Sequence, residues 1–195
     1  PDVLLFGDDT YLDGYFQCDR YFYSCFDELA LEFTLNPVAD AAVRRLKNVL
    51  SNLHNPVSLH VRRGDYVKHA SHNVCTSEYF RRALSLLRVQ VGEHDLVLFS
   101  DDVQWAVEHL GLKSDVFVMS GQKSADGGEL TASQELILMS RCHHHVISNS
   151  TFSWWGAYLN RRSEKRVYAP SVWNRSWLYP HKNILPDDWI RVPIP

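Results

Sequence analysis

The sequence predicts an α/β domain built on a mainly parallel sheet with helices on both faces. Short runs rich in β-branched and aromatic residues alternate along the chain with stretches whose apolar residues recur at helical spacing. Turn and capping residues separate these segments. Strands that alternate with helices in this way form right-handed β-α-β crossovers, which cover both faces of a parallel sheet.

The composition is that of a globular domain. The 195 residues are 45% hydrophobic and 22% charged, which excludes a disordered, collagen-like or coiled-coil chain. The net charge is −3, so no overall positive field favours nucleic acid, and membrane contact stays open. No run approaches the roughly 20 apolar residues of a membrane span, and no secretory signal is present. Because the chain starts at Pro1, we expect a processed or excised piece.

The first 55 residues differ from the rest. Residues 1–40 crowd aromatic side chains without a clean period, which predicts a packed connector. Asn36-Pro37 is interpreted as a stop signal, and a helix over residues 38–53 ends at the breaker pair Asn55-Pro56. We therefore predict a connector with one helix in residues 1–55 and a separate domain in residues 56–195.

The second segment holds the alternating elements. Strands are predicted at residues 57–61, 95–100, 116–119, 145–148 and 166–169. The helices between them have recognisable starts: Thr76 or Ser77, then Asp101-Asp102, then Thr131. A last helix, residues 154–160, is expected to be capped by the polar turn 149–153.

Polar side chains gather where these strands end. Because ligands of open parallel sheets bind beyond the carboxyl ends of the strands, we expect a site there. Its candidates are His60, Arg62 and Arg63 after the first strand, Asp101 and Asp102 after the second, and residues 148–153 after the fourth.

The two arginines carry the geometry that matches phosphate oxygens. If the strand alternation continues, Arg62 and Arg63 point in opposite directions, so that one meets the ligand and the other a structural carboxylate. His60 shares the side of Arg62. A surface pair of salt bridges is the alternative interpretation.

The turn after the fourth strand is rich in hydroxyl groups. Ser150, Thr151 and Ser153 precede a helix, whose free backbone N–H groups and positive dipole end favour an anion such as a diphosphate. Ordinary N-capping is an equally open interpretation. Trp154 and Trp155 are candidates for a wall over a sugar or base, although most such aromatic residues lie in the core.

Other features carry less weight. Asp101-Asp102 suits either the N–H donors of a guanine edge or the N-terminus of a helix. The run 142–145 contains a cysteine and three histidines, but consecutive residues cannot all face one ion, so no metal site is predicted. The tripeptide 63–65 spells an adhesion signal, yet it directly follows a buried-looking strand rather than forming a loop tip.

Residues 60–66, which read H-V-R-R-G-D-Y, resemble a motif of the α-1,2-fucosyltransferases, glycosyltransferase family 11. Residues 148–157 form a second specific match. Segments 14–17 with 21–22, 99–102, 138–142 and 186–190 agree with the family in its order. The resemblance runs from Tyr11 to Ile190, and the family's glycine-rich opening segment is absent.

The resemblance implies a Rossmann-like sheet, the donor-binding half of a GT-B-type glycosyltransferase whose N-terminal acceptor domain is missing. It implies inverting, metal-independent transfer of L-fucose from GDP-fucose to the 2-hydroxyl of a galactose-terminated glycan, without a cofactor. A catalytically idle nucleotide- or glycan-binding module of the same fold is the alternative.

The resemblance also implies roles for individual residues. Arg62 would hold the β-phosphate, while His60 and Asp102 would contact guanine. Asp65 is the nearest carboxylate that could accept the acceptor's proton, with orientation of Arg62 or capping of the turn as its alternatives. Ser153 with the neighbouring backbone N–H groups would complete the phosphate seat, and the donor-binding residues of this turn would be Ser150, Thr151, Phe152, Ser153 and Trp154.

The sequence supports two expectations for the cellular compartment of the protein. The form of Trp154-Trp155 resembles bacterial members, which favours the cytoplasm. The triplets Asn149-Ser150-Thr151 and Asn174-Arg175-Ser176 fit glycosylation acceptors, which would matter only in a Golgi lumen.

Overall fold

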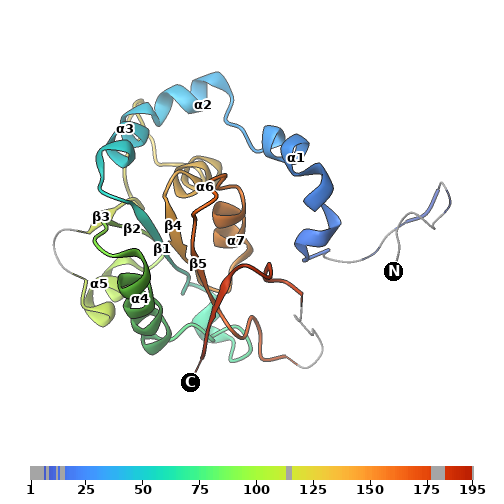
Figure 1. The fold of residues 1–195 in the computed structure, drawn as a ribbon. Helices are drawn as coiled ribbons and strands as arrows, with labels where there is room; N and C mark the ends of the chain where they lie inside the picture. Colours follow the sequence, from blue (N-terminus) through green and yellow to red (C-terminus); the bar gives the residue numbers. More distant parts are fainter. Residues whose placement is uncertain are drawn as a thin grey trace.

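The computed structural model describes residues 7, 9–11, 13, 16–112, 116–176 and 183–194. Its centre is a six-stranded sheet in the order β3-β2-β1-β4-β5-β6, with every neighbouring pair parallel (Figure 1). The predicted α/β fold with a parallel sheet is confirmed. The strands are β1 (Val57–Val61), β2 (Leu96–Ser100), β3 (Phe117–Val118), β4 (His144–Val146), β5 (Val167–Pro170) and β6 (Ile190–Val192).

The middle strand β1 is buried along its whole length. Leu59 pairs with Leu98 of β2 on one side and with Val146 of β4 on the other. A parallel strand covered on both faces needs an almost continuous apolar run, which is what residues 57–61 provide. The chain leaves β1 toward β2 and later returns to its other side as β4, so the strand order reverses between β1 and β4.

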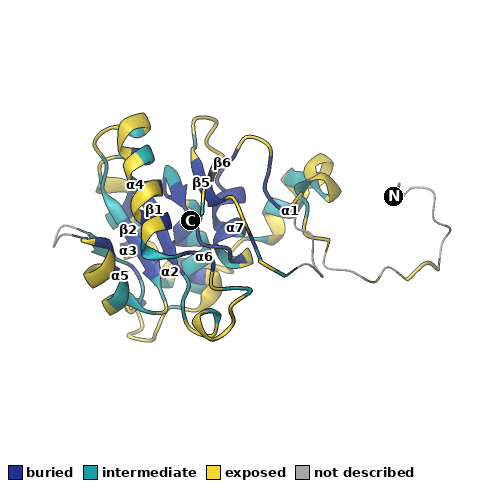
Figure 2. Cartoon of the chain, turned by 90° about the horizontal axis from the view of Figure 1, so that it is seen from below, coloured by how far each residue is buried: buried dark blue, intermediate teal, exposed yellow. Residues whose placement is uncertain are grey.

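Helices cover both faces of the sheet, as predicted. Helices α4 (Ser77–Val91) and α5 (Val103–Leu110) pack on one face, and α3 (Arg44–Asn52), α6 (Ala132–Ser140) and α7 (Thr151–Tyr158) pack on the other (Figure 1). Figure 2 shows the strands buried between them, while the outward faces of α4 and α5 are exposed. No helix among the described residues is long and apolar enough to cross a membrane.

Three helix starts follow the predicted capping residues. Thr76 accepts a hydrogen bond from the Tyr79 N–H, and Asp102 accepts one from the Trp105 N–H. Thr131 forms a reciprocal capping box with Gln134. Each cap satisfies a backbone donor that the first helical turn would otherwise leave free.

The helix predicted over residues 38–53 is two helices, and the interpretation of Asn36-Pro37 as a stop is wrong. Asn36 caps α2 (Pro37–Ala42) by accepting from the Ala39 N–H, and Pro37 occupies the first turn, where its missing N–H costs nothing. The chain breaks at Val43 before α3 begins. Leu46 and Leu50 of α3 pack in one core cluster with Val97 and Phe99 of β2, so α3 shares the core of the sheet although it precedes residue 56.

Three further elements differ from the sequence prediction. Helix α7 begins at Thr151 rather than at Trp154, with Ser150 as its N-cap residue. The connector contains α1 (Phe26–Glu32) and short 3-10 turns. The edge strand β6 has three residues, too few to show a period in the sequence.

Candidate functional site

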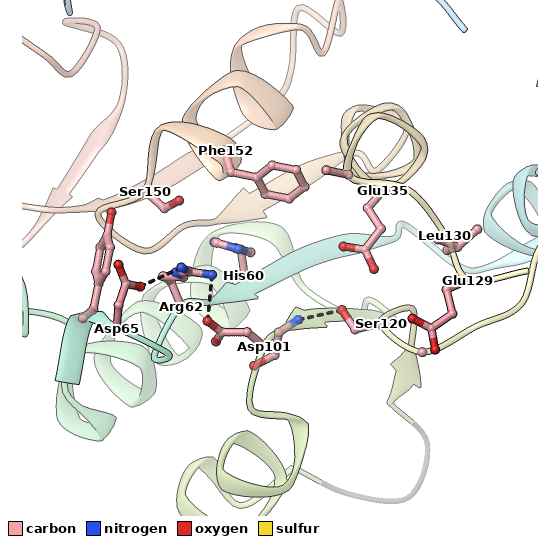
Figure 3. Close-up of a pocket in the computed structure, with 14 residues that line it drawn as sticks. His60, Arg62, Asp65, Asp101, Ser120, Glu129, Leu130, Glu135, Ser150 and Phe152 are labelled. Atoms are coloured by element: carbon pink, nitrogen blue, oxygen red, sulfur yellow. Dashed lines mark hydrogen bonds and ion pairs between the residues drawn. The ribbon is translucent and has the colours of Figure 1, made fainter. Parts of the chain in front are cut away.

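A cavity of about 690 Å³ opens at the carboxyl ends of β1 and β2, beside the reversal in strand order. This is the place where open parallel sheets bind ligands. One end is lined by Arg62, Asp65 and Ser150, and the other by Ser120, Leu130 and Glu135 (Figure 3). At one end of the cavity, Arg62 and its partner carboxylates Asp65 and Asp101 lie beside a helix N-terminus; at the other end, the carboxylates of Glu129 and Glu135 lie with Leu130.

His60 lines the cavity from the end of β1, although it is only 6% exposed. Its Nδ1 atom lies 2.8 Å from the Ser148 hydroxyl, and its ring centroid lies 5.5 Å from that of Phe152. Burial, together with the neighbouring Arg62 charge, lowers the pKa of His60 to about 3. The imidazole is therefore neutral at neutral pH, so it acts as a hydrogen-bonding group and not as a cation.

Arg62 is held between two carboxylates. Its Nη2 atom lies 2.6 Å from Asp65 Oδ1, and its Nη1 atom lies 2.9 Å from Asp101 Oδ2. The Arg62 hydrogen bond lowers the pKa of the Asp65 carboxyl. The ring of Tyr66 lies 5.5 Å from the guanidinium carbon. Two ion pairs and an aromatic ring thus fix the charged head of Arg62 at the cavity.

Arg63 points away from Arg62, as strand alternation predicts. Its Nε atom lies 3.1 Å from Asp102 Oδ2, and its guanidinium lies 3.8 Å from the centroid of the Trp105 ring. Its backbone N–H donates to Asp101 Oδ1 over 2.8 Å. The adhesion tripeptide 63–65 is therefore a strand-end turn whose charged side chains are both paired.

The structure does not place Asp102 in the cavity. Its carboxylate caps α5 by accepting from the Trp105 N–H over 3.1 Å and pairs with Arg63. Both carboxylate oxygens of Asp102 are thus bound within the protein. The sequence allowed two interpretations of this pair, helix capping and guanine contact. The structure shows helix capping for Asp102, and a guanine role for Asp102 has no support in this geometry.

The first turn of α7 is divided between the cavity and the core. Ser150 and Phe152 line the cavity, and the Ser150 side chain makes no capping hydrogen bond. Helix geometry leaves the N–H groups of residues 151–153 without intrahelical partners, so they can bind an anion.

The other turn residues point elsewhere. The Ser153 hydroxyl is fully buried and lies 3.2 Å from the Ser150 carbonyl oxygen, to which it donates. Trp154 packs in the core, and its indole N–H donates to the Ile184 carbonyl over 2.7 Å. Thr151 lines a separate pocket. The predicted phosphate seat therefore keeps its backbone N–H groups and Ser150, but not the side chains of Thr151, Ser153 and Trp154.

Glu135 is a cavity residue that the sequence did not indicate. It lies in the first turn of α6 and points into the cavity opposite Ser120 (Figure 3). Burial raises the pKa of the Glu135 carboxyl, and a hydrogen bond with Ser120 opposes that rise. The sequence feature that could have indicated Glu135 is the predicted helix start at Thr131. A crossover helix that follows a loop begins near the carboxyl edge of the sheet.

The histidine run 143–145 is not a metal centre. The three rings have separate partners: Asn55 for His143, the Arg166 N–H for His144, and Ser58 for His145. Within the described ranges, no group of three His, Cys, Asp or Glu side chains is arranged to hold a metal ion.

The side-chain amide of Asn149 is also hydrogen-bonded within the protein. It is buried and donates to the carbonyls of His72 and Trp173 over 2.9 Å each. The glycosylation triplet that begins at Asn149 is therefore inaccessible in the folded protein.

The sequence matches the family model described as Glycosyl transferase family 11 over residues 4–192. The chain belongs to glycosyl transferase family 11. The match confirms the resemblance seen in residues 60–66 and 148–157. These two segments follow the adjacent strands β1 and β4, which is why the structure brings Arg62 and Ser150 of this family member to one cavity.

Three relatives in the family are similar over much of the chain. The O-antigen biosynthesis glycosyltransferase WbnK of Escherichia coli is 37% identical over 131 residues, 65% of this chain and 42% of that protein. The alpha-1,2-colitosyltransferase of Escherichia coli is 32% identical over 184 residues, 92% of this chain and 61% of that protein. Galactoside alpha-(1,2)-fucosyltransferase 2 of Pongo pygmaeus is 29% identical over 161 residues, 78% of this chain and 46% of that protein. The chain thus spans about half the length of these relatives.

Proposed function

We propose that this family 11 chain binds GDP-fucose and serves the transfer of its L-fucosyl group to the 2-hydroxyl of a terminal galactose. The observation that carries the proposal is that Arg62 and the open N-terminus of α7 face one cavity. The names of the relatives, an alpha-1,2-colitosyltransferase and a galactoside alpha-(1,2)-fucosyltransferase, support an α-1,2 transfer of a deoxysugar.

The end that holds Arg62 suits the diphosphate of the donor through the guanidinium and the start of α7. The Arg62 guanidinium can bind phosphate oxygens in a bidentate manner, and the N–H groups of residues 151–153 add a positive helix end. During transfer, negative charge builds on the departing GDP while the fucosyl carbon becomes cationic. Groups fixed in advance near the leaving oxygens stabilise that charge where it develops, so we propose a transfer that needs no metal ion.

The other end suits the base. Guanine presents two adjacent donors, the N1–H and the exocyclic amino group, to a single carboxylate, whereas adenine and cytosine place an acceptor beside their amino group. Glu135 lies at this end next to Leu130, and we assign it the guanine contact in place of Asp102. His60 lies between the two ends (Figure 3), where its neutral ring can contact the base, as the resemblance implies.

Asp65 is the proposed proton acceptor. Its carboxylate is exposed at the Arg62 end of the cavity and is bound to Arg62 in the free protein. When the diphosphate takes over the Arg62 Nη2 donor, the pKa of Asp65 rises toward its ordinary value and the carboxylate becomes a better base. The acceptor oxygen then bonds to the anomeric carbon as the bond to the β-phosphate oxygen breaks. The electron pair leaves with GDP, and the acceptor's proton passes to Asp65.

Calorimetric titration of the 195-residue chain tests the binding part. GDP should bind, and Arg62→Ala should weaken binding about 100-fold or more, because each lost hydrogen bond to a charged group is worth about 1.5–3 kcal/mol. Arg82→Ala, an exposed arginine paired with Glu78 on α4, is the matched control and should bind GDP normally. Glu135→Gln should reduce the preference for GDP over ADP. Chelator should change none of these affinities.

No heat with GDP from the folded chain would refute the proposal. Transfer itself is tested with GDP-fucose and a galactoside on a form extended to the length of the relatives. GDP binding without any turnover in that form would show a binding module that lacks the reaction.

A further inference from the structure

A second, smaller cavity lies across the first turn of α7 from the one just described. Its volume is about 230 Å³, and α7 contributes Thr151, Trp154 and Trp155 to its wall. These positions are spaced i, i+3 and i+4, so they share one face of the helix. Ser150 and Phe152 line the larger cavity instead. A single helical turn, the one proposed to bind the diphosphate, therefore borders both cavities.

The lining of this small cavity combines aromatic rings with hydrogen-bonding groups. Phe16 and Phe22 face it from the N-terminal segment, and Gln17 and Thr151 supply an amide and a hydroxyl. A pyranose ring has an apolar face of C–H groups and a rim of hydroxyls, so it needs both kinds of surface within one small pocket.

Phe16 has an unusual backbone for its residue type. Its φ is +48°, in the left-handed region, and its side chain is 40% exposed. A bulky residue in this conformation is strained, and such conformations concentrate at ligand-binding sites. Next to it, the amide of Gln17 is exposed and makes no side-chain hydrogen bond within the described residues. One aromatic ring and one amide are thus presented together at the mouth of the cavity.

The opposite wall is rigid. The Trp155 ring is stacked between Phe22, with centroids 5.2 Å apart, and Phe33, with centroids 4.9 Å apart. The indole N–H of Trp154 is bonded to the Ile184 carbonyl. These aromatic rings therefore give the wall a fixed shape, and Phe16, whose ring contacts Tyr21 edge-on with centroids 5.5 Å apart, faces it together with Gln17.

We propose that this cavity binds one pyranose ring beside the diphosphate. The inference rests on the proposed function for the identity of the sugar, which is either the fucosyl group of the donor or the galactose of the acceptor. Both have the same recognition chemistry, an apolar ring face on Phe16 and hydroxyls on Gln17 and Thr151. Both must also come close to the phosphate end of the donor.

Binding experiments on the 195-residue chain separate the two sources. Calorimetry compares GDP-fucose with GDP, and saturation-transfer NMR detects methyl β-D-galactopyranoside in the presence of saturating GDP. The test variants are Gln17→Ala and Phe16→Leu. Tyr23→Leu, which changes an exposed aromatic residue of the same segment outside both cavities, is the matched control.

If the cavity holds the donor sugar, GDP-fucose should bind more tightly than GDP, and both test variants should remove that difference. If it holds the acceptor, the galactoside signal should fall at least fivefold in both test variants. In either case, GDP affinity should be unchanged in all three variants.

Two results would overturn the inference: no effect of either substitution on either sugar, or a parallel loss of GDP affinity in both test variants. Failure of the unmodified chain to bind GDP, with the galactoside signal retained and sensitive to Gln17→Ala, would refute the proposed function and leave the pyranose site standing.

Discussion

Mild acid should destabilise this protein through two buried histidines. His60 lies at the end of β1 against the Ser148 hydroxyl, and burial lowers its pKa to about 3. His145 is fully buried in β4, with Nδ1 2.7 Å from the Ser58 hydroxyl and Nε2 2.8 Å from the Asn160 amide nitrogen. Burial lowers the pKa of His145 well below its ordinary value. Both rings are therefore neutral in the folded protein.

The sign of the effect follows from the unfolded state. An unfolded histidine takes up a proton near pH 6.5, whereas these two stay neutral in the fold until a much lower pH. Their stabilising contribution is present above pH 6.5 and is lost as the pH falls toward the folded pKa values. Each group contributes up to about 1.4 kcal/mol per pH unit. Between pH 7.5 and 5.5, the two together should lower the free energy of unfolding by about 3 kcal/mol.

Urea denaturation followed by circular dichroism at pH 7.5 and 5.5 measures this difference. His60→Gln and His145→Gln should each remove about half of the acid-induced loss, whatever they do to the stability at pH 7.5. His143 and His144, whose pKa values are also lowered by burial, add smaller contributions of the same sign. Equal unfolding free energies of the wild type at the two pH values would refute the assignment of neutral buried rings.

Substitutions at Gly156, Gly64 and Asp102 test close contacts and helix capping in this part of the fold. Gly156→Ala would place a Cβ 2.9 Å from Met139 Cγ, so the melting temperature should fall by the equivalent of about 1–3 kcal/mol. The Gly156→Ala/Met139→Ala double variant should lose less stability than the sum of the two single losses, because the shorter side chain leaves room for the Cβ; an unchanged melting temperature in Gly156→Ala would contradict the close contact. Gly64→Ala would place a Cβ 2.7 Å from Asp101 Oδ2 and displace it from Arg62, so calorimetry should show GDP affinity reduced several-fold. Asp102→Ala should lower the free energy of unfolding by about 1–2 kcal/mol through the lost cap and leave GDP affinity within twofold. A large loss of GDP affinity in Asp102→Ala would restore Asp102 as a base contact.

The layers of the fold were predictable because their signals are local. The buried run of β1 and the capping box of Thr131 with Gln134 each depend on a few neighbouring residues. The reversal of strand order between β1 and β4 depends on contacts between distant segments, and no local pattern carries it. The helix start at Asn36 was missed for a different reason, because its local signal is ambiguous. Asn36-Pro37 has the residues of a helix start as well as those of a stop.

The candidate site shows the same division. The opposite directions of Arg62 and Arg63 follow from strand alternation, and the structure has them so. Strand alternation does not show which of Asp101 and Asp102 lines the cavity. That depends on the dihedral angles of an N-cap residue, φ −143° and ψ 70° at Asp102. Glu135 reaches the cavity only because α6 crosses the sheet beside it, a tertiary relation that spacing along the chain cannot show.

The two carboxylates on Arg62 have different exposures, and this difference indicates how the site can bind an anion. The side chain of Asp101 is 26% exposed and that of Asp65 is 62% exposed. An exposed ion pair is screened by water and contributes little, whereas a more buried pair is harder to replace. A diphosphate should therefore displace Asp65 and leave Asp101 in place. Asp101 then keeps the guanidinium oriented toward the cavity while the released Asp65 carboxylate, beside the same phosphate, becomes available to an acceptor hydroxyl.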